Sequence, residues 1–158
     1  MYPGEGAEKG ETVVEAGLWI PLKVPETFAF FSVETNLEKI TPPFMGFQVL
    51  RKSTSEIQEG TLIDYRLKVH GLPMRLRTRI ESWKPGESFV DNQLSGPYSL
   101  WHHTHSFSER DGGTWMTDRV RFRLPLGRLG NLVAGWLVKR DVRLIFNFRN
   151  AAIQSLLG

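Results

Sequence analysis

The sequence predicts an α+β fold: a curved antiparallel sheet of about seven strands wrapped around a long C-terminal helix, with two short helices after the first strand. Over residues 47–124, apolar and polar side chains alternate in several segments, the pattern of strands with one covered face. Residues 131–157 instead have the apolar spacing of an amphipathic helix. Because an apolar sheet face must be covered, we expect this helix to lie across the sheet.

The elements before the alternating region are short. Residues 12–20 are predicted to form the first strand. Pro25 suits the start of a helix over residues 27–31, because a proline in the first turn loses no helical hydrogen bond. A second helix is predicted over residues 35–40, where Thr35 begins a capping-box pattern.

Six further strands follow, and the Gly- and Pro-rich turns between them indicate that consecutive strands pair in antiparallel fashion. We predict these strands at residues 47–54, 61–69, 74–83, 88–94, 98–108 and 114–124. The alternation breaks over residues 80–83, which predicts a β-bulge there. One face of the strands is apolar and the other is rich in charge, so the sheet is expected to be covered on one side only.

The C-terminal helix is expected to turn a broad apolar side towards the sheet. That side holds Ala134, Leu137, Val138, Val142, Leu144, Ile145, Phe148, Ala152 and Leu156. Lys139 and Arg140 fall on the opposite, polar side, and so does Trp136. Together with Leu129 and Leu132, this tryptophan and the adjacent basic pair fit a transient contact with a membrane, and a contact between copies of the chain would explain the exposed tryptophan equally well.

The composition bounds the class of protein. The chain has 158 residues, of which 41% are hydrophobic and 23% charged, as in soluble globular proteins. We predict a disordered tail over residues 1–11 and a single ligand-binding domain over residues 12–158. There is no cysteine, which excludes disulfides and thiolate chemistry and fits a cytoplasmic location. No apolar run is long enough to span a membrane, and the polar N-terminus is unlike a signal peptide.

Several short strings resemble one known superfamily. They are the Phe-rich segment 24–31, the segment 89–93, the pattern Trp101-x-His103-x-His105-x-Phe107, and Asp118-x-Val120. With the order of elements, they make residues 13–156 resemble the START-like, or SRPBCC, superfamily of ligand carriers, lipid-transfer domains and aromatic polyketide cyclases. The resemblance implies a helix-grip fold with a cavity under the long helix that binds an apolar or amphipathic ligand.

Polar residues interrupt the predicted inner face of the sheet. His103 and His105 share a strand face with large apolar residues, and Asp118 interrupts the apolar stripe of the neighbouring strand. Asp91 and Arg149 are also expected to face inwards. Buried ionised groups are costly unless they are paired, so these residues are expected to meet.

This inner cluster has two interpretations. In the functional one, it forms a polar end of the cavity, where His103 or His105 acts as general acid or base and Asp118 or Asp91 orients it. In the structural one, the same residues form a satisfied network of buried ion pairs. Two histidines with a carboxylate also match the ligand count of a catalytic zinc site. Because nothing else in the sequence completes such a site, we predict no metal ligands.

The predicted site residues fall into two sets. The candidate catalytic residues are His103, His105 and Asp118. The candidate ligand-binding residues are Tyr65, Leu67, Thr78, Phe89, Asp91, Trp101, Phe107, Met116, Phe122, Leu137, Asp141, Ile145, Phe148 and Arg149.

The function predicted from these features is the binding of a hydrophobic or amphipathic small molecule or lipid, as a carrier or sensor. The alternative function is that of an aromatic or polyketide cyclase or dehydratase, a lyase that uses the inner histidines and aspartates. A third hypothesis is an interaction protein that binds no ligand. No phosphate-binding loop or serine elbow is present, so a non-enzymatic role without a cofactor is favoured. Arginine rows at residues 75–79 and 119–123 are interpreted as a solvated outer face paired with acids, so no nucleic-acid partner is expected. The oligomeric state is not predicted.

Overall fold

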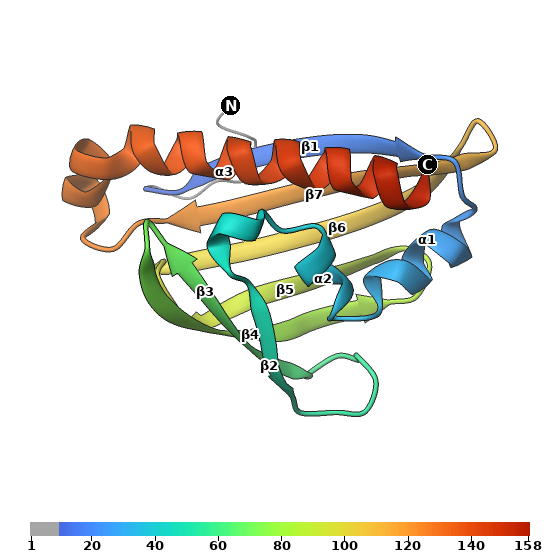
Figure 1. The fold of residues 1–158 in the computed structure, drawn as a ribbon, viewed down its shortest axis with the longest axis horizontal. Coiled ribbons are helices and arrows are strands. Elements are labelled where there is room, and N and C mark those ends of the chain that lie inside the picture. Colours follow the sequence, from blue (N-terminus) through green and yellow to red (C-terminus); the bar gives the residue numbers. More distant parts are fainter. Residues whose placement is uncertain (1–9) are drawn as a thin grey trace.

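The computed structural model describes residues 10–158, apart from the side chains at positions 127, 128, 131 and 133. Seven strands and one long helix make up most of the chain (Figure 1). The elements in order are β1 (Thr12–Ile20), α1 (Val24–Phe31), α2 (Asn36–Lys39), the 3-10 helix η1 (Pro43–Met45), β2 (Gln48–Lys52), β3 (Leu62–Val69), β4 (Leu72–Lys84), β5 (Ser88–Ser95), β6 (Leu100–Arg110), β7 (Gly113–Arg123) and α3 (Gly127–Leu157).

The strands form one antiparallel sheet in the order β1-β7-β6-β5-β4-β3-β2. Consecutive strands from β2 to β7 pair as the short turns predict, and β1 pairs with β7 at the far edge. The sheet curves around one side of α3, and α1 lies near the C-terminal end of that helix (Figure 1). The predicted helix-grip architecture is therefore confirmed.

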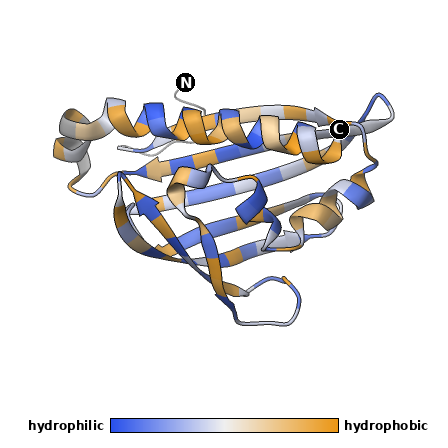
Figure 2. Cartoon of the chain, in the orientation of Figure 1, coloured by the Kyte–Doolittle hydropathy of each residue, from blue (hydrophilic) through white to orange (hydrophobic). Residues whose placement is uncertain are grey.

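Alternation of side chains explains why one face of the sheet packs inwards. On β7, Met116, Val120 and Phe122 are buried, whereas the arginines between them lie on the outer face. Figure 2 shows this alternation of hydrophilic and hydrophobic positions along β7. The pairing of β4 with β5 shifts register between Ile80 and Ser82, which confirms the predicted bulge.

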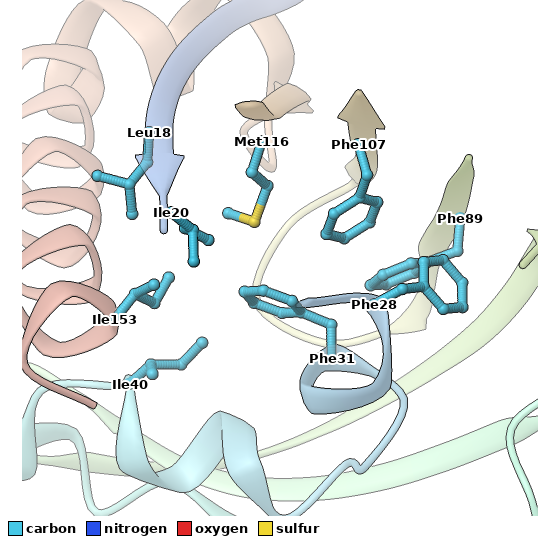
Figure 3. Close-up of a cluster of buried hydrophobic side chains, with 9 residues drawn as sticks. All are labelled: Leu18, Ile20, Phe28, Phe31, Ile40, Phe89, Phe107, Met116 and Ile153. Carbon is cyan, nitrogen blue, oxygen red and sulfur yellow. The ribbon is translucent and has the colours of Figure 1, made fainter. Parts of the chain in front are cut away.

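A cluster of buried apolar side chains closes one end of the grip. Phe28 of α1 lies beside Phe89 of the sheet, and Phe31 points towards Ile153 near the end of α3 (Figure 3). The ring centroids of Phe28 and Phe107 are 5.3 Å apart in an edge-on arrangement. Because this end is filled by side chains, any space for a ligand must lie towards the other end of α3.

The face that α3 turns to the sheet includes the predicted Val142 and Arg149 but differs from the predicted one at other positions. Val142, Phe146, Arg149 and Ile153 are buried. The predicted inward residues Leu144, Phe148 and Leu156 are 50%, 36% and 50% exposed. Apolar residues cover much of the circumference of α3, so the pattern alone did not specify which stripe packs. Because residues 142, 146, 149 and 153 face the sheet, Arg149 points towards the buried carboxylate of Asp118, which compensates its charge.

The two arginine rows lie apart on the outer face, because β5 and β6 separate β4 from β7. Arg119 bonds to Glu15 at 3.0 Å, and Arg121 and Arg123 contact Glu11 at 3.3 and 3.4 Å. Glu11, which the sequence assigned to the tail, is thus held against β7; residues 1–9 of that tail lie outside the described residues. Of the helices in residues 10–158, none combines the length and the apolarity needed to cross a membrane.

Candidate ligand-binding site

A cavity of about 500 Å³ lies between the sheet and the middle of α3. Apolar and aromatic side chains form most of its wall, among them Leu67 and Val69 of β3, Trp101 of β6, and Ile145 and Phe146 of α3. Polar side chains also line it, and five of them lie on β4, β5, β6 and α3: Thr78, Asp91, His103, His105 and Arg149. We call these five residues, together with Asp118, which contacts both histidines, the polar end of the cavity.

Strand pairing brings the ionisable residues of the polar end together. His103 and His105 are two residues apart on β6, so both point to the inner face. Asp91 lies opposite His103 in the pair of β5 with β6, and Asp118 lies opposite His105 in the pair of β6 with β7. Each carboxylate bonds to a histidine, since neighbouring positions on one sheet face are within reach of long side chains.

One oxygen of Asp118 accepts contacts from three donors. Its Oδ1 is 2.8 Å from Nε2 of His103, 2.9 Å from Nδ1 of His105 and 3.4 Å from Nη2 of Arg149. Burial alone would raise the pKa of Asp118, but the charge of Arg149 and the two histidine hydrogen bonds hold it well below its ordinary value. Asp118 is therefore a buried carboxylate that remains ionised.

His105 lies between two carboxylates. Its Nε2 is 2.8 Å from Oδ2 of Asp91, while its Nδ1 faces Asp118. A carboxylate only accepts, so the imidazolium form, in which both ring nitrogens donate, satisfies both contacts. Burial lowers the pKa of His105, but its hydrogen bonds to Asp118 and Asp91 outweigh burial and raise it. Nη2 of Arg149 lies 3.4 Å from this Nδ1, and both nitrogens contact the same oxygen of Asp118.

His103 has the opposite protonation state. Burial and the positive charge of His105 lower the pKa of His103 to about 4, against the effect of its hydrogen bond to Asp118. The two rings are stacked with centroids 3.8 Å apart, which explains why they cannot both be charged. Because Nε2 donates to Asp118, Nδ1 of His103 carries a lone pair. No hydrogen bond to this nitrogen is found among the described residues.

The formal charges of the polar end cancel. Burial would raise the pKa of Asp91, but the hydrogen bond to His105 and the charges of His103, His105 and Arg149 lower it, so Asp91 is ionised. Two carboxylates then balance the imidazolium of His105 and the guanidinium of Arg149. Tyr65, which also lines the cavity, stays a neutral donor because burial and the charge of Asp91 raise its pKa.

The same residues fit an ion-pair network better than a metal site. Ligand atoms of Asp91, His103 and His105 lie within 4.8 Å of one another. However, both nitrogens of His105 already face carboxylates, and a metal ligand must present a lone pair. A cation would also lie beside the guanidinium of Arg149.

The structure brings most of the predicted site residues to the cavity, but not all of them. Those that line it are Tyr65, Leu67, Thr78, Asp91, Trp101, His103, His105, Asp141, Ile145 and Arg149. Asp118 lies next to the cavity-lining histidines without being part of the wall. Phe89, Phe107 and Met116 belong to the apolar cluster at the closed end, and Phe122 packs against Trp101. Leu137 and Phe148 lie outside the lining because α3 presents a different stripe.

Several lining residues were not predicted from the sequence. Phe146 neighbours Ile145 on α3 but was not among the residues predicted on the apolar side of this helix. Tyr98 follows the Gly-Pro turn after β5, and burial together with the charge of Asp141 raises its pKa to about 12. His70 also lines the cavity, and its Nε2 is 2.6 Å from Oδ2 of Asp141. The contact joins the tip of the β3–β4 hairpin to α3 over 71 residues of sequence, which no local pattern could indicate.

Comparisons with known proteins define the fold. No protein-family model and no curated protein matches the chain. Among solved structures, the Zhui aromatase/cyclase from Streptomyces sp. R1128 is similar with a TM-score of 0.72 and 14% identity, over 93% of each chain. The major latex-like protein 151 of Panax ginseng has a TM-score of 0.67 and 10% identity, over 94% of this chain and 98% of that one. Protein CV1439 from Chromobacterium violaceum has a TM-score of 0.72 and 11% identity, over 92% and 97%. The chain thus has the START-like helix-grip fold that these structures share.

Proposed function

We propose that this protein binds a hydrophobic or amphipathic small molecule in the cavity between the sheet and α3, as a carrier or sensor. The observation that carries the proposal is a cavity of about 500 Å³ with apolar walls and a polar end. Ligand sites in proteins combine these features, because apolar walls supply affinity and a few polar groups fix orientation. An aromatase/cyclase and a major latex-like protein with the same fold are consistent with this use of the space.

Native mass spectrometry of gently purified protein tests the proposal. We expect an adduct that leaves on denaturation and is identified as an apolar or amphipathic molecule after extraction. The variant Ile145→Trp fills the cavity from α3 and should lose the adduct, whereas Phe148→Trp, on the same helix but outside the lining, should keep it. An adduct retained equally by both variants would contradict a ligand in this cavity.

A second candidate function is a lyase of the cyclase or dehydratase type. It is favoured by the neutral ring of His103, which is oriented by Asp118 and has a nitrogen free to accept a proton in a residue that lines the cavity. The test incubates the extracted ligand with the protein and follows loss of water by mass spectrometry. His103→Ala should abolish turnover and keep binding; unchanged turnover in this variant would exclude the mechanism.

Membrane contact at the start of α3 forms part of the carrier proposal. Leu129, Leu132 and Trp136 are 58%, 81% and 67% exposed, an unusual concentration of apolar surface on one helix. Arg140, whose guanidinium is 5.9 Å from the Trp136 ring, lines the cavity one turn later. An apolar stripe beside exposed basic residues suits an anionic membrane, from which a carrier would take up its ligand.

A further inference from the structure

The polar end of the cavity holds three atoms that lack hydrogen-bond partners in the described part of the chain. Two are buried donors that meet no acceptor within hydrogen-bond distance: Nε of Arg149, and the hydroxyl Oγ1 of Thr78, which is still close enough to the Tyr65 hydroxyl to oppose the rise in its pKa. The third is the acceptor Nδ1 of His103. Thr78, His103 and Arg149 are 4%, 5% and 8% exposed, and all three line the cavity.

Buried donors like these two are uncommon inside proteins, because a buried polar group without a partner loses its hydration and gains nothing in return. Two other buried atoms share this state, Oδ1 of Asn92 and Oδ1 of Asn150, but neither residue lines the cavity. The three atoms of the polar end are therefore distinguished by their place: they surround the space that the proposed ligand would occupy. Together they offer donors and one acceptor.

The charge of the polar end restricts the ligand further. Asp91 and Asp118 are balanced by His105 and Arg149, and each of these four is already in contact with an opposite charge. A carboxylate brought against the polar end would add a negative charge that neither His105 nor Arg149 is free to compensate; the other cationic residues of the wall, Lys68 and Arg140, are not part of the polar end. A neutral group adds hydrogen bonds without this cost.

We propose that the polar end selects a neutral hydroxyl-bearing head, an alcohol, enol or phenol, over a carboxylate and over a plain hydrocarbon. The hydroxyl hydrogen is donated to Nδ1 of His103, and the oxygen accepts from Thr78 or Arg149. The inference rests on the proposed binding function and narrows the class of ligand. It makes Thr78 and His103 specificity-determining residues of the cavity.

Three probes of nearly equal shape test the inference: naphthalene, 2-naphthol and 2-naphthoate, titrated calorimetrically into the full-length protein at neutral pH. We expect 2-naphthol to bind roughly tenfold more tightly than naphthalene, as one or two hydrogen bonds allow. 2-Naphthoate should bind more weakly than either. Equal affinities, or a preference for 2-naphthoate, would overturn the inference and leave the binding function intact. If none of the three binds, both the inference and the proposed cavity function fail.

A pair of variants locates the selectivity. Thr78→Val removes the hydroxyl at nearly constant shape and should reduce the preference for 2-naphthol over naphthalene severalfold. Thr104→Val makes the same change on the outer face of β6 and should leave the preference unchanged. Equal preference in both variants would contradict the role of Thr78.

A measurement on the unmodified protein covers the case in which Thr78→Val fails to fold. The ¹⁵N chemical shift of His103 Nδ1 should move when 2-naphthol binds, because a hydrogen bond forms at that nitrogen, and should stay in place with naphthalene. An unchanged shift with bound 2-naphthol would exclude His103 as the acceptor.

Discussion

His103 and His105 are chemically identical, two residues apart on one strand, and differ in protonation. The number of carboxylates that each one meets explains the difference. His105 bonds to both Asp91 and Asp118, whereas His103 bonds to Asp118 alone and stacks on the charged ring of its neighbour. The hydrogen-bond partners of the two rings therefore determine their protonation states, which residue type alone does not distinguish.

Histidine titration followed by NMR checks this assignment. We expect the ring nitrogens of His103 to show the neutral form with the proton on Nε2 at pH 6, because its pKa is lowered to about 4. His105 should show a charged ring at the same pH and should lose its proton above the ordinary pKa of 6.5. The reverse assignment, or two rings that titrate together near 6.5, would contradict the network.

The two shifts have opposite effects on stability. The raised pKa of His105 stabilises the folded state. This contribution to the free energy of unfolding is complete below pH 6.5 and is lost as pH rises through the pKa of His105 in the folded protein. The lowered pKa of His103 makes a contribution that is present above pH 6.5 and is lost as pH falls towards about 4. The lowered pKa values of Asp91 and Asp118 add to the loss on the acid side, so acid should destabilise the fold.

At the scale of single elements, α3 determines both the shape of the cavity and the packing of the closed end. Its buried stripe predicts that Ile153→Ala lowers the free energy of unfolding by about 2–5 kcal/mol, because a fully buried side chain leaves a cavity. Leu156→Ala should change it by less than about 0.5 kcal/mol, since Leu156 is exposed. Urea unfolding of both variants measures the difference, and equal losses would contradict the observed rotation of the helix.

The first turns of α3 have a separate test. We expect the protein to float with vesicles that contain phosphatidylserine, and Trp136→Ala to reduce the bound fraction by roughly tenfold, because a large apolar side chain no longer enters the lipid. Leu156→Ala is the control, since this exposed residue lies about 30 Å further along the same helix. Flotation that is unchanged by Trp136→Ala would remove membrane contact from the proposed function.

At the scale of the whole molecule, the cavity is bounded by parts of the chain that are distant in sequence. The contact of His70 with Asp141 links the β3–β4 hairpin to α3 beside the cavity. His70 and Gly71 both have positive φ angles, 48° and 81°, which form the tight hairpin turn that directs the imidazole to the helix.

Weakening this link should speed ligand exchange. We expect Asp141→Asn to raise the dissociation rate of 2-naphthol by roughly two- to fivefold, the effect of weakening one partly exposed side-chain contact. Stopped-flow displacement measures the rate. Asp64→Asn breaks a comparable pair with Arg77 on β3 and β4 away from this contact and should leave the rate unchanged. A dissociation rate equal to that of the unmodified protein would show that the link does not restrict exchange.

Much of the architecture follows from the sequence, because strand alternation and turn residues are local properties. The alternation on β7 identified Met116, Val120 and Phe122 as inner-face residues, and the broken pattern near Ile80 located the bulge. The same period placed His103 and His105 inside. Periodicity reports which face a side chain occupies, but not whether the space in front of it is filled.

Tertiary structure alone decided which inner-face residues border a cavity and how they are charged. Phe107 and His105 share one face of β6, yet α1 covers the phenylalanine and leaves the histidine beside open space. The stripe of α3 that packs, with Arg149 in it, is set by the buried carboxylate of Asp118, since compensation of a buried charge outweighs the small apolar differences around the helix. Local patterns therefore determined the fold, whereas the protonation states and the unpartnered atoms of the polar end depend on contacts between distant elements.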